Sequence, residues 1–219
     1  MGLLDEFSTS QARPLPVLLL LDVSGSMRAD DKIEALNAGV QELLEELRNE
    51  DDGMGAIHVG IITFGGDEAR LALPFQPVGV AELGRLDAGG RTPLGGAFDL
   101  ARQLLEDRDV IPSRAYRPTI ALMSDGIPTD EWEDALAKLL ASERASKATR
   151  MAVGVGADAD RNVLVRFAED VRRIEHASQI RDYLQFVTMT VAQQAASSDP
   201  EARGTVDAPH LPRWEDERY

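Results

Sequence analysis

The sequence predicts an α/β protein with a mainly parallel central sheet and helices on both faces. Apolar runs of strand length, such as 16–22 and 118–124, are typical of strands buried on both sides. Between these runs, apolar residues recur at spacings of three, four and seven, which indicates amphipathic helices. Strands that alternate with helices favour a parallel sheet. A chain of 219 residues is long enough for one such domain.

The first half of the chain predicts three strands and one helix. Residues 16–22 form a continuous apolar run that ends in an acid, as expected of a buried strand. Residues 30–48 have an apolar stripe opposite a face rich in glutamate, which predicts a helix. Strands are expected at 56–64 and 69–75. Pro74 places the latter at a sheet edge or ends it, because proline cannot donate a backbone hydrogen bond.

The second half begins with a glycine-rich loop that leads into a helix. Thr92 is expected to be the N-cap of this helix and Pro93 its first residue. A further helix should open at Thr129 or Asp130. The remaining expected elements are strands at 118–124, 150–155 and 171–175 and helices at 160–168 and 178–194.

The pattern divides the chain into one domain with an extension at each end. Residues 1–13 are polar and aperiodic and are interpreted as a flexible N-terminal arm. Residues 14–194 contain all the periodic segments and form the domain. Residues 195–219 are polar, contain prolines and show no periodicity, so they are predicted to be an acidic, disordered tail. Leu211 and Trp214 stand among charged residues near its end, which leaves a docking peptide as the alternative.

Composition excludes several classes of function. The formal net charge of −15, from 38 acidic and 23 basic residues, disfavours nucleic acids and anionic membranes as partners. The chain has no cysteine, which excludes disulfides, thiolate metal sites and cysteine nucleophiles. No apolar run approaches the ~18 residues of a membrane span. The first residues do not resemble a secretory signal, so a cytoplasmic location is expected.

Oxygen-bearing side chains follow two predicted strands and precede a predicted helix. Asp22, Ser24 and Ser26 come directly after the first strand, Asp125 follows a later strand, and Thr92 precedes a helix. In open parallel sheets, ligands bind at the carboxyl ends of the strands, where these segments should meet. An all-oxygen set suits a hard cation, Mg²⁺ first, with Mn²⁺ or Ca²⁺ as alternatives. Each residue alone is common in turns and caps, but their joint occurrence favours a metal site.

These segments resemble the von Willebrand factor A domain family over residues 14–194. Asp22, Ser24 and Ser26 match the family's D-x-S-x-S motif, and Thr92 and Asp125 match the other two positions of its metal-ion-dependent adhesion site. The resemblance implies a Rossmann-like sheet in the order 3-2-1-4-5-6 with an antiparallel edge strand. It also implies hydroxyl contacts to the metal, aspartates that act directly or through water, and a partner protein's Glu or Asp that completes the coordination. The family usually binds proteins and has no catalysis of its own.

Three stretches resemble one bacterial branch of this family, the TerY-type proteins. They are LLLDVSGSM at 19–27, GGRTPLGGA at 89–97 and MSDGIPTDEW at 123–132. This resemblance implies a role as an adaptor in a tellurium-resistance, stress-response or defence complex. Because such domains also occur beside AAA+ motors, the alternative is a subunit that works with an ATPase in a chaperone or metal-insertion complex.

A metal-dependent phosphatase is the less favoured interpretation, and the chain is not expected to be an enzyme. Haloacid-dehalogenase chemistry needs an acid where Ser24 stands. A receiver-type phosphoacceptor needs a lysine at a later strand end, and Lys32, Lys138 and Lys147 are not expected there. The chain also has no G-x-x-x-x-G-K-[ST] phosphate loop.

Overall fold

The computed structural model describes residues 13–51, 56–197, 199, 206, 208 and 210–214. The expected arm at 1–13 therefore lies outside the described residues except for Arg13, whose guanidinium lies over the Tyr116 ring. No helix in these ranges is both long and apolar enough to cross a membrane.

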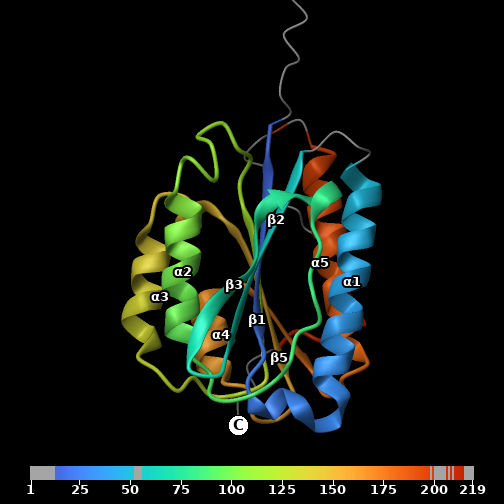
Figure 1. Ribbon diagram of the computed structural model, residues 1–219, viewed down its shortest axis with the longest axis vertical. Helices are drawn as coiled ribbons and strands as arrows, with labels where there is room; N and C mark the ends of the chain where they lie inside the picture. The colour runs from blue at the N-terminus through green and yellow to red at the C-terminus, as the bar shows by residue number, and fades with distance from the viewer. Residues whose placement is uncertain are drawn as a thin grey trace, which may run out of the picture.

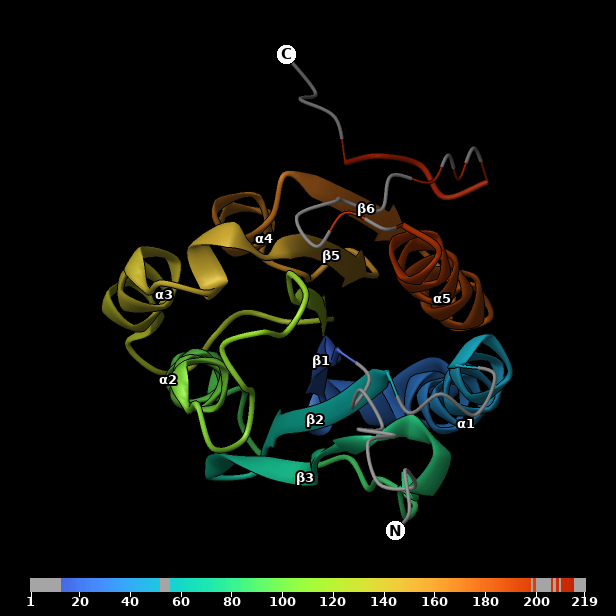
Figure 2. The same cartoon turned by 90° about the horizontal axis from the view of Figure 1, so that it is seen from above.

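In the described part of the chain, six strands form one sheet in the order β3-β2-β1-β4-β5-β6, as predicted (Figure 2). Among these six strands, β2 and β3 pair antiparallel, and the other four neighbouring pairs are parallel. The first three strands along the chain are β1 (Leu15–Asp22), β2 (Ile57–Gly65) and β3 (Glu68–Pro77). The others are β4 (Thr119–Ser124), β5 (Thr149–Val155) and β6 (Asp170–Ile174).

Five α-helices in the described part of the chain cover the two faces of the sheet (Figures 1 and 2). One face carries α1 (Lys32–Asp51) and α5 (Gln179–Ala195). The other face carries α2 (Leu94–Glu106), α3 (Trp132–Ala141) and α4 (Arg161–Phe167).

The central strand β1 is buried along its whole length and contributes to two cores. Val17, Leu19 and Leu21 join the core beneath α1 and α5. Leu18 and Leu20 join the core beneath the other three helices. Successive side chains of a strand point to opposite faces, so this one apolar run supplies both sides of the sheet.

Helix α1 begins later than the sequence pattern predicts. It starts at Lys32 rather than at residue 30, because a 3₁₀ segment, η1 (Gly25–Asp31), follows β1. The chain therefore leaves β1 through a tight segment before it turns into the helix.

Strand β3 continues past Pro74 to Pro77 at the sheet edge. It can do so because Pro74 falls in an irregular part of the β2–β3 register, between the pairs made by Leu73 and Gln76. The predicted edge position is confirmed, whereas the predicted end of the strand, at residue 75, is two residues too early.

The described part of the C-terminal segment packs on the edge strand β6, which differs from the disordered tail predicted for 195–219. The Trp214 amide donates to the Val171 carbonyl at 2.8 Å, and Leu211 is buried. The Arg172 guanidinium donates to the Leu211 carbonyl at 2.6 Å. Leu211 and Trp214, the two residues that suggested a docking peptide, lie in this packed part. Disorder was the favoured prediction because the segment shows no periodicity, but a few apolar residues and backbone hydrogen bonds can hold such a segment against an open sheet edge.

This packing predicts that Leu211→Ala destabilises the domain. Loss of a buried leucine side chain should lower the free energy of unfolding by roughly 2–5 kcal/mol. Urea unfolding followed by circular dichroism measures the change. Val80→Ala, at a side chain that is 66% exposed, is the control and should stay within about 0.5 kcal/mol of wild type. Equal stability of Leu211→Ala and wild type would show that the segment does not contribute to the fold.

Candidate metal-ion site

The five residues predicted to bind a metal come together at the carboxyl edge of the sheet. Asp22 is the last residue of β1, and Asp125 directly follows β4, the strand beside it. Ser24 and Ser26 lie where the chain passes from β1 into η1. Figure 1 shows this passage at the lower end of the sheet. Thr92 lies two residues before α2. Asp22, Ser24, Thr92 and Asp125 are buried, and Ser26 is exposed.

A chain of hydrogen bonds joins the serines to the second aspartate. The hydroxyls of Ser24 and Ser26 lie 3.0 Å apart, and the Ser26 hydroxyl donates to Asp125 Oδ1 at 2.6 Å. Asp22 is linked to this chain through the backbone of Ser24: its Oδ1 accepts from the Ser24 amide at 2.8 Å, and its Oδ2 accepts from the Ser124 hydroxyl at 2.7 Å. Four of the five predicted residues thus form one hydrogen-bonded cluster.

The Thr92 hydroxyl lies near the cluster, across the space beside Gly126. A Cβ at Gly126 would lie 3.7 Å from Ser26 Oγ and 3.8 Å from Thr92 Oγ1, so both hydroxyls border the same space. The Thr92 loop is held in place by Gly90, whose φ is +70°. A Cβ at Gly90 would lie only 2.3 Å from the Cα of Gly66, so this approach of the loops requires glycine.

The donor set fits a hard divalent cation. The atoms around the space are hydroxyl and carboxylate oxygens, which Mg²⁺, Mn²⁺ and Ca²⁺ prefer. Within the described ranges, no three His, Cys, Asp or Glu side chains gather into a group that could hold a metal ion. Hydroxyl groups would therefore supply most of the ligands at this site.

Burial raises the pKa of Asp22 from 3.8 to about 6. The hydrogen bonds from Ser24 and Ser124 oppose this shift because they favour the carboxylate, whereas the charge of Asp125 adds to it. A carboxyl group with a raised pKa in the folded state makes folding less favourable as the pH rises from about 4 to about 6. The ionised form of Asp22 therefore destabilises the metal-free domain at neutral pH.

Sequence reasoning missed one residue of this cluster. Lys32 Nζ lies 2.7 Å from Asp125 Oδ2, although no lysine was expected at the end of a strand. It reaches this edge from the first residue of α1 rather than from a strand. Its position ten residues after Asp22, at the start of the helix that returns from β1, is the sequence feature that could have indicated it.

The predicted N-cap role of Thr92 was wrong. Helix α2 begins at Leu94, and the Asp130 carboxylate accepts hydrogen bonds from the amides of Gly95 and Gly96 at 2.9 and 3.0 Å. Asp130 comes from the loop before α3, so a distant segment caps α2. The backbone of Thr92 instead pairs with Thr129, whose hydroxyl accepts from the Thr92 amide at 3.1 Å.

Asp130→Ala should therefore destabilise the domain without removing an oxygen atom from the candidate site. The change leaves two amides at the positive end of the helix dipole without their carboxylate partner. We expect the free energy of unfolding to fall by roughly 0.5–2 kcal/mol, as for the loss of an N-cap. Thermal unfolding measures this effect, and a stability equal to that of wild type would contradict the capping role.

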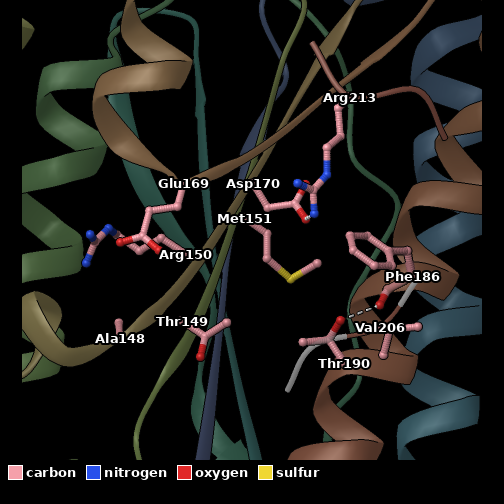
Figure 3. Close-up of a pocket in the computed structure, with 10 residues that line it drawn as sticks. All are labelled: Ala148, Thr149, Arg150, Met151, Glu169, Asp170, Phe186, Thr190, Val206 and Arg213. Atoms are coloured by element: carbon pink, nitrogen blue, oxygen red, sulfur yellow. Dashed lines mark hydrogen bonds and ion pairs between the residues drawn. The ribbon is translucent and has the colours of Figure 1, made fainter. Parts of the chain in front are cut away.

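A separate pocket of about 140 Å³ lies near the amino ends of β5 and β6 (Figure 3). Thr149 and Asp170, the first residues of these strands, line it together with Phe186 of α5. The Thr190 hydroxyl donates to the Phe186 carbonyl, the interaction dashed in Figure 3. The pocket shares no lining residue with the cluster around Asp125, so it plays no part in that site.

Sequence comparison decides the family. The sequence pattern of the von Willebrand factor type A domain matches residues 17–127, just over half of the chain. The chain belongs to this family. The match starts inside β1 and ends at residue 127, three residues after β4. It therefore contains all five residues of the candidate site.

Two curated proteins resemble part of this von Willebrand factor type A domain protein. One is the uncharacterized protein Rv2850c of Mycobacterium tuberculosis, 34% identical over 116 residues, which are 52% of this chain and 18% of that protein. The other is the uncharacterized protein YfbK of Escherichia coli, 33% identical over 92 residues, which are 40% of this chain and 15% of that protein. The chain thus spans less than a fifth of the length of these relatives.

Solved structures share the fold at low sequence identity. A von Willebrand factor type A protein from Catenulispora acidiphila has a TM-score of 0.66 and 20% identity, covering 83% of this chain and 43% of that chain. Proximal thread matrix protein 1 from the mussel byssus, in a structure with a zinc-occupied MIDAS motif, has a TM-score of 0.62 and 18% identity. That match covers 83% of this chain and 48% of the mussel chain. At least one protein with this fold therefore holds a divalent metal.

Proposed function

We propose that this domain binds a divalent cation, Mg²⁺ first, through Asp22, Ser24, Ser26, Thr92 and Asp125, and uses it to bind an acidic residue of a partner protein. One observation carries the proposal: hydrogen bonds link the Ser24 and Ser26 hydroxyls to Asp125, and the Thr92 hydroxyl lies beside the same space. The bound cation would supply positive charge and an open coordination position to a carboxylate of the partner.

Charge explains why the cation is needed for this binding. The three hydroxyl ligands carry no charge, and the chain as a whole has a formal net charge of −15. Without a cation, the protein would repel an acidic partner. With the cation bound, the electrostatic potential at the site becomes positive.

Calorimetry with MgCl₂ and MnCl₂ tests metal binding at these residues. We expect Ser26→Ala to lower the affinity at least about tenfold, because it removes a ligand without changing any charge. Ser146→Ala is the matched control, since the Ser146 hydroxyl is exposed and donates to the Glu143 carbonyl in a different part of the domain. Equal affinities of Ser26→Ala and wild type would remove this site from the proposal.

Metal affinity should also fall below about pH 6. With a pKa of about 6, Asp22 is mostly protonated at pH 5 and mostly ionised at pH 7.5. Protonation removes negative charge next to the cation, so we expect an affinity about tenfold lower at pH 5. Titrations at the two pH values measure this change, and an affinity that is the same at both would contradict a role for ionised Asp22.

We further propose that the metal-dependent interaction serves a bacterial tellurium-resistance, stress-response or defence complex. The support is the resemblance of the loops at 19–27, 89–97 and 123–132 to TerY-type proteins. Affinity capture from the native host, in Mg²⁺ and in EDTA, identifies the proteins whose retention depends on the metal. Retention of an AAA+ ATPase would favour the motor-associated alternative instead.

We also propose that the domain has no catalytic activity of its own. Asp22 is fully buried, and both of its carboxylate oxygens accept hydrogen bonds, so it is not available as a nucleophile. Hydrolysis of a phosphoester by the pure protein, lost in Asp22→Asn, would contradict this.

A further inference from the structure

Lys32 places a second cation beside the candidate metal site. Its Nζ lies 2.7 Å from Asp125 Oδ2, and only 14% of its side chain is exposed. The Asp125 side chain is fully buried. This is therefore a mostly buried ion pair, in which each charge depends on the other much more than in a surface pair.

The backbone before Lys32 adopts an unusual conformation. Asp30 and Asp31 both have positive φ angles, 54° and 57°, in the left-handed region that residues other than glycine seldom occupy. Such conformations persist where the surrounding structure enforces them, commonly at functional sites. Here they are the last two residues of η1, immediately before the residue whose side chain reaches Asp125.

The two oxygens of Asp125 face different partners. Oδ1 accepts from Ser26, on the side of the hydroxyl cluster, whereas Oδ2 accepts from Lys32. Lys32 can therefore remain paired with Oδ2 while Oδ1 faces the serine hydroxyls and the proposed metal. The ammonium group neutralises one of the two carboxylates without occupying the space beside Gly126.

We propose that Lys32 sets the charge of the site. Its positive charge lowers the affinity of the domain for the metal and raises the affinity of the bound metal for a carboxylate from outside the domain. This inference rests on the proposed function. With both aspartates ionised, Lys32 protonated and a divalent cation bound, the cluster has a formal charge of +1. Without Lys32 the same cluster would be neutral, and an acidic ligand would gain less from binding. Lys32 is thus a positioning and charge-setting residue that acts through Asp125.

The test replaces Lys32 and measures two affinities. In Lys32→Met, the affinity for Mn²⁺, measured by calorimetry, should rise on the order of tenfold because a nearby positive charge is lost. The affinity of the Mn²⁺-loaded protein for acetate, measured by water-proton relaxation at constant ionic strength, should fall several-fold. A purely structural role for Lys32 would not move the two affinities in opposite directions.

Three further variants make the result specific. Lys138→Met is the matched control, since it changes the net charge equally at an exposed lysine paired with Asp134 on α3. Lys32→Arg should restore both affinities toward wild type by restoring the charge. Lys32→Gln, which can still donate a hydrogen bond, replaces Lys32→Met if the latter does not fold.

The outcomes separate this inference from the proposed function. If wild type binds Mn²⁺ and the uncharged Lys32 variants bind it equally or more weakly, the charge-setting role is wrong and the metal site stands. If acetate binding does not fall in those variants, the charge-setting role is also wrong. If neither wild type nor any variant binds Mn²⁺, both proposals fail.

Discussion

Asp22→Asn should stabilise the metal-free domain and at the same time weaken metal binding at least about tenfold. In wild type, burial raises the pKa of Asp22 to about 6, so its ionisation at pH 7 opposes folding. An asparagine keeps an acceptor for the Ser24 amide and can donate to the Ser124 hydroxyl, without the buried charge. We expect the free energy of unfolding to rise by about 1–3 kcal/mol at pH 7.

The pH dependence gives this prediction a second check. Between pH 4 and pH 6, the stability of wild type should fall relative to that of Asp22→Asn, because folded wild type loses a proton that the unfolded chain has already released. Below pH 4 the free energies of unfolding of wild type and Asp22→Asn should be equal. Urea unfolding in EDTA across this range measures both proteins. An Asp22→Asn protein that is less stable than wild type at every pH would contradict the buried-charge account.

Thr92→Ala should abolish metal-dependent binding while leaving the domain folded. It removes a hydroxyl from the space beside Gly126 and changes no charge. Because Asp130 rather than Thr92 caps α2, the substitution should cost less than about 1 kcal/mol of stability. Calorimetry with Mg²⁺ and thermal unfolding measure the two effects.

Asp130→Ala should have the opposite effects on stability and metal affinity to those of Thr92→Ala. It should lower stability but keep metal affinity close to that of wild type at a temperature where it is folded. If both variants lost stability and affinity together, the loss of binding by Thr92→Ala would reflect unfolding rather than a missing ligand. If Thr92→Ala kept its Mg²⁺ affinity, Thr92 would not be a ligand.

Much of the fold could be predicted because the dominant signals are local. The apolar runs of β1 and β4 are buried on both sides, and the amphipathic stripe of α1 predicts its packing on the sheet. The strand order and the antiparallel edge came from the family resemblance rather than from such patterns, and the structure confirms them. The clustering of Asp22, Ser24, Ser26 and Asp125 follows from strand ends that meet at one edge.

The features that sequence reasoning missed depend on contacts between distant segments. Asp130 caps α2 across 35 residues of chain, and Lys32 reaches Asp125 across 93. Leu211 is buried against β6, whereas the polar sequence around it favoured disorder over a docking peptide. In each case the partner is set by the three-dimensional packing, which a local pattern does not encode.

Anomalous diffraction from crystals soaked in MnCl₂ would test the central claim most directly. The account predicts an anomalous peak in the space beside Gly126, within coordination distance of the hydroxyl oxygens of Ser26 and Thr92, with Lys32 still paired with Asp125. Manganese bound only elsewhere on this acidic protein, with the space beside Gly126 empty, would contradict it.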